Sequence, residues 1–304
     1  MEYRYTAHSI GWLANKILSE KKTTPLVRLL FDNTLYLDSI DDMIIVTKKH
    51  YLSPITVDLY PNNEEKPFSR ILKIREKAII DKNLIRIGNL TINIDKAGIY
   101  KSRRIAPPSL DSLREACKIL DKSLKMTLIL YSSTNAKFPI FKTLEFKKFI
   151  NEVVYPFMRG DAEILYNTEK YRMLLGVGEG FTPSGDDFIL GFIGVINFFH
   201  KLLSIRKVRL NEKILFESTN WASAMYIRYM QQEIYDEKIE DFFSAISSCQ
   251  PHDALDSLFS IARRGHISGL DISLGLTIGL ASIAGFLIDE EIASNTVSYT
   301  HLLK

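Results

Sequence analysis

The 304-residue chain contains little cysteine and carries little net charge. Only Cys117 and Cys249 occur, with no Cys-x-x-Cys and no nearby histidine pair, which argues against a disulfide framework or a structural zinc and favours a reducing compartment. The formal net charge is +3, and no basic stripe is interleaved with aromatics, so nucleic acid is not an expected partner. Residues 1–20 lack the order of a signal peptide. We therefore expect a cytoplasmic protein.

Long apolar runs are also scarce. Residues 272–288 form a run of 17 residues without a charge, which is at the short end of the membrane-spanning range. Asp271 and the acids at 289–291 bracket it, and hydroxyl residues interrupt it. We interpret it as a buried core helix and expect no membrane partner.

The hydrophobic period changes from two to 3.6 near Pro107-Pro108. This change predicts an α+β fold, in which a β-rich N-terminal subdomain (residues 1–105) packs on a larger, mostly α-helical C-terminal subdomain (residues 106–304). Strands are expected at 27–31, 34–37, 43–47 and 55–59 and as two short strands within 84–94. Residues 8–19 are predicted to form a leading helix, residues 62–67 form a polar loop, and residues 71–82 are ambiguous.

The second part of the chain has helical periodicity almost throughout. Helices are predicted at 110–122, 144–158, 162–175, 185–203, 211–232, 239–247, 254–263 and 269–288. Residues 126–131 fit a strand, and residues 294–304 lose the pattern and resemble a frayed tail.

The most informative segment is Gly-Val-Gly-Glu-Gly-Phe-Thr-Pro-Ser-Gly-Asp-Asp at residues 176–187. Glycines on alternate positions allow positive φ angles and close approach to a ligand. Hydroxyls, carboxylates and an apolar helix follow. This order of glycine loop, polar turn and apolar helix places backbone N–H groups and polar side chains at one helix N-terminus. Such a position suits an anion or a metal–anion pair.

Structural explanations exist for the same segment. Ser184 and Asp187 have the spacing of a capping box, and Pro183 fits a helix entry. No Gly-Lys-Ser/Thr follows the glycines, and residues 169–175 look helical rather than strand-like, so neither a Walker loop nor a dinucleotide fingerprint fits. The spacing by itself favours structure and function equally.

A second copy of the motif changes this balance. Aligning Ser268-Gly269 with Ser184-Gly185 places Asp271 on Asp187 and Gly275 on Gly191. Both copies have the pattern Ser-Gly-x-Asp-x-x-x-Gly. Glycine stripes, which continue to Gly279 and Gly194, allow helices to approach closely, so we predict that the two helices cross and that their N-termini lie side by side. Glycine packing of buried helices without a ligand is the competing account.

The Gly-x-Gly-x-Gly-x-Thr-Pro-Ser-Gly-Asp-Asp block and the downstream Gly-His-x-Ser-Gly-x-Asp-x-x-x-Gly resemble the AllH-like family, formerly a domain of unknown function. That family includes a subunit of bacterial oxamate carbamoyltransferase, which acts in allantoin degradation. The resemblance implies a β-rich front half, a helical back half, a transferase complex with other protein subunits, and a small anionic substrate.

The two motifs supply the candidate site. Candidate catalytic residues are Asp187, His266 and Asp271. Candidate substrate-binding residues are Gly178, Gly180, Thr182, Ser184, Gly185, Asp186, Ser268 and Gly269.

Several roles stay open in this set. Asp186 and Asp187 are adjacent on a helix and point about 100° apart, so they cannot form a facing dyad. His266 fits a proton carrier and a plain loop residue equally. Arg263 and Arg264 would attract an anion if they point inward. We expect no bound cofactor and no protein-held metal, although Mg²⁺ suits the oxygen ligands present.

Two functions remain possible. A carbamoyltransferase-type enzyme needs an anion clamp and donors for a carbonyl that develops charge, and paired helix N-termini can supply both. The alternative is a non-catalytic binding or assembly subunit of a multi-chain enzyme, because no strong acid, base or nucleophile stands out.

Overall fold

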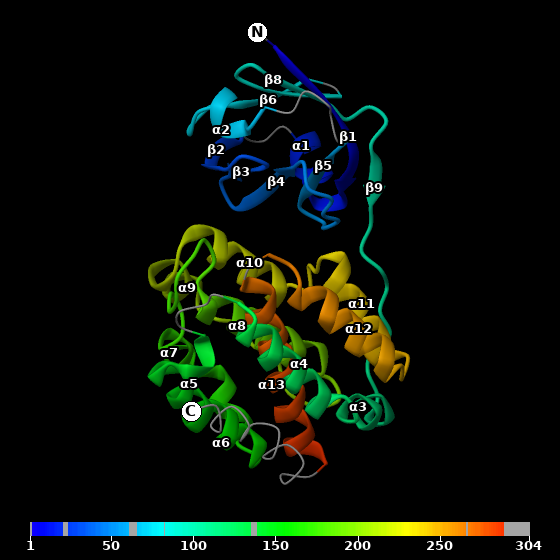
Figure 1. Ribbon diagram of the computed structural model, residues 1–304, viewed down its shortest axis with the longest axis vertical. Helices are drawn as coiled ribbons and strands as arrows, with labels where there is room; N and C mark the ends of the chain where they lie inside the picture. The colour runs from blue at the N-terminus through cyan, green and yellow to red at the C-terminus, as the bar shows by residue number, and fades with distance from the viewer. Residues whose placement is uncertain are drawn as a thin grey trace. The chain divides into compact units, whose positions relative to one another are not determined.

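The computed structural model describes residues 2–20, 24–60, 66–81, 83–134, 139–265 and 267–288 (Figure 1). The chain divides into two compact units. One comprises Met1–Arg103 with Tyr235–Glu237, and the other comprises Arg104–Ile234 with Lys238–Lys304. The predicted α+β class is confirmed, since the strands lie in the first unit and the described part of the second is helical. The predicted tail at 294–304 lies outside the described residues.

The N-terminal unit is a nine-stranded sheet with the order β2-β3-β4-β5-β1-β8-β7-β6, and β9 pairs with β1. Its strands are β1 (Tyr3–Gly11), β2 (Leu26–Leu30), β3 (Thr34–Ser39), β4 (Asp42–Thr47), β5 (Thr56–Leu59), β6 (Ala78–Asp81), β7 (Leu84–Ile87), β8 (Leu90–Asn93) and β9 (Gly98–Tyr100). The sheet nearly closes, because the Val27 N–H donates to the Glu76 carbonyl at 2.9 Å and the Ala78 N–H donates to Pro25 at 2.7 Å.

Alternating apolar residues fill the interior of this sheet. Val27, Leu35, Val57 and Ile85 are fully buried there with Phe68 of α2 (Phe68–Ile71). Period-two alternation of this kind places one face of each strand in the core. The strands predicted between residues 27 and 59 and within 84–94 are confirmed, and the ambiguous segment supplies β6.

The predicted helix at residues 8–19 is wrong over its first part. Residues 3–11 form β1, and helix α1 (Trp12–Glu20) begins only after Gly11. Tyr5 and Ala7 are buried on alternate positions, so the sheet core decides the conformation. A Cβ on Gly11 would lie 2.2 Å from the Pro54 carbonyl oxygen, which accepts the N–H groups of Leu13 and Ala14 at the helix start.

The second unit contains the other helices. They are α3 (Leu110–Cys117), α4 (Leu120–Ser132), α5 (Leu144–Phe149), α6 (Tyr155–Met158), α7 (Thr168–Arg172), α8 (Ser184–Phe198), α9 (Glu212–Ser218), α10 (Trp221–Gln231), α11 (Glu237–Ser247), α12 (Pro251–Ala262) and α13 (Ser268–Leu287). A π-helical turn at Ile150–Val154 joins α5 to α6, and short 3₁₀ turns occupy Ile140–Lys142 and Ala162–Tyr166.

The strand predicted at residues 126–131 is wrong, because these residues belong to α4. Leu124, Thr127 and Tyr131 are the buried residues of one helical face. A spacing of three and four residues places them together on a helix, whereas strand alternation would separate them.

Helices α8 and α13 form the centre of this unit (Figure 1), and nearly every residue of both is buried. Among the described residues, α13 is the one helix long and apolar enough to cross a membrane by length and composition. However, 83% of its most apolar window is buried inside the fold. This burial agrees with the predicted core helix.

Candidate functional site

The centre of the candidate site is the crossing of α8 and α13. A Cβ on Gly191 would lie 2.3 Å from the Ile272 carbonyl oxygen, and one on Gly275 would lie 2.1 Å from the Phe188 carbonyl oxygen. Real Cβ atoms do not approach backbone atoms so closely, so both positions require glycine. The predicted close crossing is therefore confirmed.

One member of the predicted glycine stripe does not face the crossing. A Cβ on Gly194 would lie 2.7 Å from the Met230 sulfur of α10. Gly194 therefore packs against a flexible side chain and not against α13. The prediction that it continues the α8 stripe is wrong.

The two helix N-termini lie side by side, as predicted. The hydroxyl oxygens of Thr182 and Ser268 are 2.7 Å apart, and the Thr182 hydroxyl donates to Asp187 Oδ2 at 2.8 Å. Thr182 thus links Asp187 of the first motif to Ser268 of the second. Polar groups from both motifs share one hydrogen-bonded chain at the junction.

The glycine after each serine packs tightly against the segment that precedes its helix. The Gly185 N–H donates to the Val177 carbonyl at 2.8 Å, and the Gly269 N–H donates to the Arg264 carbonyl at 3.2 Å. A Cβ would lie 2.0 Å from a carbonyl oxygen at Gly185 and 2.1 Å from one at Gly269. The Ser-Gly-x-Asp repeat is therefore a structural repeat in which two turn–helix units face each other.

The serines do not cap their own helices. The N-cap residues are Pro183 for α8 and Ile267 for α13, and neither cap makes a side-chain hydrogen bond. Ser184 and Ser268 are already the first helical residues, and the Ser268 hydroxyl contacts Thr182 across the junction. The capping-box explanation of the first motif is therefore wrong.

The glycine loop covers the start of α8. Gly176, Gly178 and Gly180 have φ angles of 78°, 110° and 106°, a region that side chains with a Cβ rarely adopt. A Cβ on Gly178 would lie 2.8 Å from the Ser184 nitrogen. All three glycines are exposed, so the loop presents backbone to solvent directly over the junction.

Asp186 faces away from the junction and holds this loop. Its carboxylate accepts the Gly176 N–H at 2.8 Å and the hydroxyls of Thr219 and Ser223. Burial raises its pKa, and these hydrogen bonds oppose the shift. Asp186 and Asp187 thus point to different partners, as expected for neighbours on a helix.

Asp187 and Asp271 form a buried acid pair at the junction. They are 4% and 1% exposed. Burial raises the pKa of Asp187 well above its ordinary value, and the nearby Asp271 charge raises it further. Burial also raises the pKa of Asp271 to about 7, against hydrogen bonds from Tyr131 and Ser184. The pair can therefore retain a proton near neutral pH.

Tyr131 of α4 is a member of this cluster that the sequence did not indicate. Its hydroxyl donates to Asp271 Oδ1, and its ring contacts Phe141 edge-on with centroids 5.1 Å apart. Asp271 Oδ2 is buried without a hydrogen-bond partner of good geometry. Tyr131 is 140 residues from Asp271 in sequence, and no local spacing signals such a contact.

The other sequence candidates lie elsewhere. His266 lies outside the described residues. Arg263 is exposed, with its guanidinium 5.3 Å from the Phe259 ring centroid. Arg264 is partly buried, and its carbonyl serves the turn before α13.

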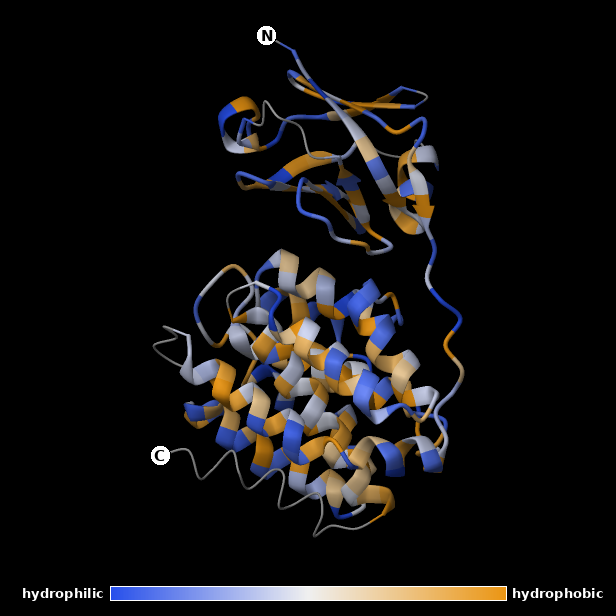
Figure 2. Ribbon diagram, turned by 45° about the vertical axis from the view of Figure 1, so that its right-hand side comes forward, coloured by the Kyte–Doolittle hydropathy of each residue, from blue (hydrophilic) through white to orange (hydrophobic). Residues whose placement is uncertain are grey.

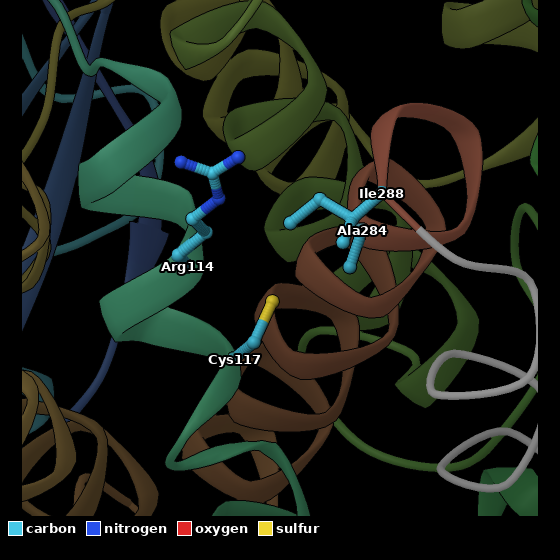
Figure 3. A pocket seen from close by; sticks show the side chains of 4 residues that line it. All are labelled: Arg114, Cys117, Ala284 and Ile288. Atoms are coloured by element: carbon cyan, nitrogen blue, oxygen red, sulfur yellow. The ribbon is translucent and has the colours of Figure 1, made fainter.

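A small cavity of about 110 Å³ lies at the other end of α13. Figure 3 shows Cys117 and Arg114 of α3 beside Ala284 and Ile288 at this cavity. Along a helix, residues 268 and 284 are about 24 Å apart, so the cavity is separate from the junction. Burial raises the pKa of Cys117 to about 11, which leaves little thiolate for nucleophilic attack.

Part of the chain is similar to a known protein family. Residues 174–280 match the family model described as oxamate carbamoyltransferase subunit AllH. This match supports an AllH-like family assignment. The matched segment contains both Ser-Gly-x-Asp motifs and the turns before them, so the resemblance predicted from these motifs is confirmed. No curated protein and no solved structure matches the chain.

The name of the AllH family suggests a subunit of a carbamoyltransferase, which agrees with an assembly containing other protein subunits. The name describes the family, and the match covers the part of the chain that forms the junction. Residues 1–173, which include the whole nine-stranded sheet, lie outside it.

Proposed function

We propose that this AllH-like chain is a carbamoyltransferase-type subunit that binds a small anion, carbamoyl phosphate or a small carboxylate, at the junction of α8 and α13. The observation that carries the proposal is the polar contact between the motifs, in which the Thr182 hydroxyl donates to Asp187 and lies 2.7 Å from the Ser268 hydroxyl oxygen of the other motif. A packing motif alone needs the glycines and not this chain of hydroxyls and carboxylate.

The accessible part of the junction has the chemistry of an anion site. Two helix N-termini concentrate partial positive charge there. The exposed backbone at Gly178 and Gly180 and the partly buried hydroxyls of Thr182 and Ser268 lie above the acid pair. Raised pKa values let that pair carry a proton, which lowers its repulsion of a bound anion.

The same groups fit carbamoyl transfer. The acceptor nitrogen attacks the carbamoyl carbon, the bond from that carbon to the phosphate oxygen breaks, and phosphate leaves. The acceptor nitrogen loses a proton, which an ionised Asp271 takes up as a base whose pKa is near the working pH. The exposed backbone of the glycine loop and the hydroxyls of Thr182 and Ser268 stabilise the negative charge on the carbonyl oxygen.

Calorimetric titration with carbamoyl phosphate and with oxamate tests the proposal, with and without Mg²⁺. We expect Ser268→Ala to weaken binding by about tenfold or more, the scale of a lost hydrogen bond to a charged group. Asp187→Asn should change affinity much more than stability. Ser132→Ala, at an exposed serine of α4, is the control and should bind normally.

Thermal unfolding of the same variants separates binding from stability. If Ser268→Ala and Asp187→Asn lower the melting temperature and leave both affinities unchanged, the junction is structural and the proposed binding site is wrong.

A second candidate function is a binding or assembly subunit whose partner performs the chemistry. The word subunit in the family description favours it. An assay of the purified chain alone, with carbamoyl phosphate and oxamate, separates the two. Product formation by the chain alone would exclude this alternative, whereas binding without turnover would support it.

A further inference from the structure

The N-terminal unit contains a cluster of metal-ligating side chains, unrelated to the junction. His8, His50 and Asp58 each offer one ligand atom, and these atoms all lie within 4.8 Å of one another. The Nδ1 atoms of His50 and His8 are 2.8 Å and 3.7 Å from Asp58 Oδ2. We propose that His8, His50 and Asp58 bind a divalent transition-metal ion, with Zn²⁺ as the favoured occupant.

The sheet topology brings the three residues together. Strand β5, which carries Asp58, lies between β1 and β4. Asp58 pairs with Thr47 of β4, and His50 follows Thr47 by three residues. On the other side, Asp58 pairs with Ser9 of β1, directly after His8. His8 on β1 and His50 just after β4 thus approach one carboxylate from the two sides of β5.

An irregularity in β1 helps to aim His8. Ala7 pairs with Leu59, whereas Ser9 pairs with Asp58, so two steps along β1 correspond to one step along β5. His8 is the extra residue of this bulge, and bulges commonly redirect a side chain. Ala7 and Leu59 point into the core, so His8 and Asp58 share the outer face.

The burial of Asp58 is the second observation that points to a ligand. Its side chain is only 2% exposed. One oxygen faces the histidines, and Oδ1 is buried with no hydrogen-bond partner. A buried carboxylate with an unmet oxygen is costly, and a plain Asp58–His50 hydrogen bond leaves this oxygen unmet. A bound cation would compensate the carboxylate charge.

The chemistry of the donors selects the class of metal. Imidazole nitrogen and carboxylate oxygen suit Zn²⁺ and its neighbours better than Mg²⁺ or Ca²⁺. A tetrahedral ion with bonds of about 2.05 Å holds its ligand atoms about 3.3 Å apart, which lies between the distances of 2.8 Å and 3.7 Å from the histidine Nδ1 atoms to Asp58 Oδ2. Three protein ligands leave a position open to water or a partner's side chain, and the exposed histidine rings (46% and 66% for the side chains) make that position accessible.

The test is calorimetric titration of Zn²⁺ into the full-length, tag-free chain after treatment with a chelator. We expect one equivalent to bind tightly. His8→Ala and His50→Ala should each weaken binding by at least about tenfold, the scale on which even outer partners of a metal ligand change affinity. His252→Ala, at an exposed histidine of α12, should leave it unchanged.

Cobalt substitution provides an independent readout, because Co²⁺ in a tetrahedral site absorbs visible light strongly. Asp58→Asn should abolish that absorption, and if this buried substitution prevents folding, the two exposed histidine variants decide. Absence of a stoichiometric Zn²⁺ equivalent in the wild type, or wild-type affinity in both histidine variants, overturns the proposal. Loss of zinc binding would leave anion binding at the junction unaffected, so the two proposals fail independently.

Discussion

At the scale of single residues, Asp271 gives a stability prediction with a definite sign. Its pKa is about 7 in the folded chain, against about 3.9 for an unperturbed aspartate. Between these values the folded state holds a proton that the unfolded state has lost. The free energy of unfolding therefore falls as the pH rises from about 4 to about 7, and the stability supplied by the protonated form is lost above that range.

Asp271→Asn removes this titration. The variant should gain stability relative to the wild type as the pH rises from 4.5 to 7.5, by about 3 kcal/mol of the roughly 4 kcal/mol that a full shift of three pKa units carries. Urea denaturation across this range measures the difference. Asp256→Asn, at an exposed aspartate of α12, is the control, and its free energy of unfolding should change with pH as that of the wild type does. A difference between Asp271→Asn and the wild type that does not vary with pH would contradict the expected titration.

The sequence predicted much of the site at this scale, and its failures have clear causes. Ser184, Asp187, Ser268 and Asp271 could be aligned because both copies have the same local spacing. Tyr131 could not be found, because its contact depends on how α4 packs against α13 rather than on spacing. The pairing of His8, His50 and Asp58 was missed for the same reason, since it arises from strand order and a bulge.

At the scale of elements, the crossing of α8 and α13 sets a graded prediction for glycine-to-alanine changes. A Cβ on Gly191 or Gly275 meets backbone at 2.3 Å and 2.1 Å, whereas one on Gly279 meets its nearest atoms at 3.2 Å. Backbone cannot give way as a flexible side chain can. Alanine at the first two positions must therefore separate the helices.

We expect Gly191→Ala and Gly275→Ala to destabilise the fold by several kcal/mol, which is the upper range of overpacking. The higher helix propensity of alanine, roughly 1 kcal/mol, offsets only a part of this cost. Gly194→Ala meets only the end of the Met230 side chain and, with Gly279→Ala, should cost much less. Chemical denaturation gives the ranking. Equal stability of the four variants would mean that the crossing adjusts more easily than its geometry indicates.

Some helices and strands can be predicted from the local sequence pattern alone, and others cannot. The strands from β2 to β5 and the hairpin of β7 and β8 follow from alternation and turn residues. Residues 8–11 and 126–131 were assigned to the wrong state because short apolar segments fit both periods. Residues 8–11 form a strand because they pair with β5 and β9. Residues 126–131 are helical because the buried residues of α4 lie on one helical face.

At the scale of the whole molecule, we expect a protease to cut the segment that connects the two units before any other described part of the chain. Residues 101–109 connect β9 to α3 without regular structure, and most of them are exposed. Figure 2 shows the start of this segment as hydrophilic, and it contains Lys101, Arg103 and Arg104. Ser109 then fixes the start of α3 through a capping box with Ser112.

Limited trypsin digestion, followed by mass spectrometry, should therefore give early cleavage after Lys101, Arg103 or Arg104, because exposed irregular backbone fits a protease active site. The triple variant Lys101→Gln, Arg103→Gln, Arg104→Gln is the control and should lose these early products. Zinc binding should survive the cut, since His8, His50 and Asp58 all precede it and the strands that bring them together form one nearly closed sheet. Earlier cleavage inside β1–β8 or α8 than in this segment would show that the units are less stable than their connection.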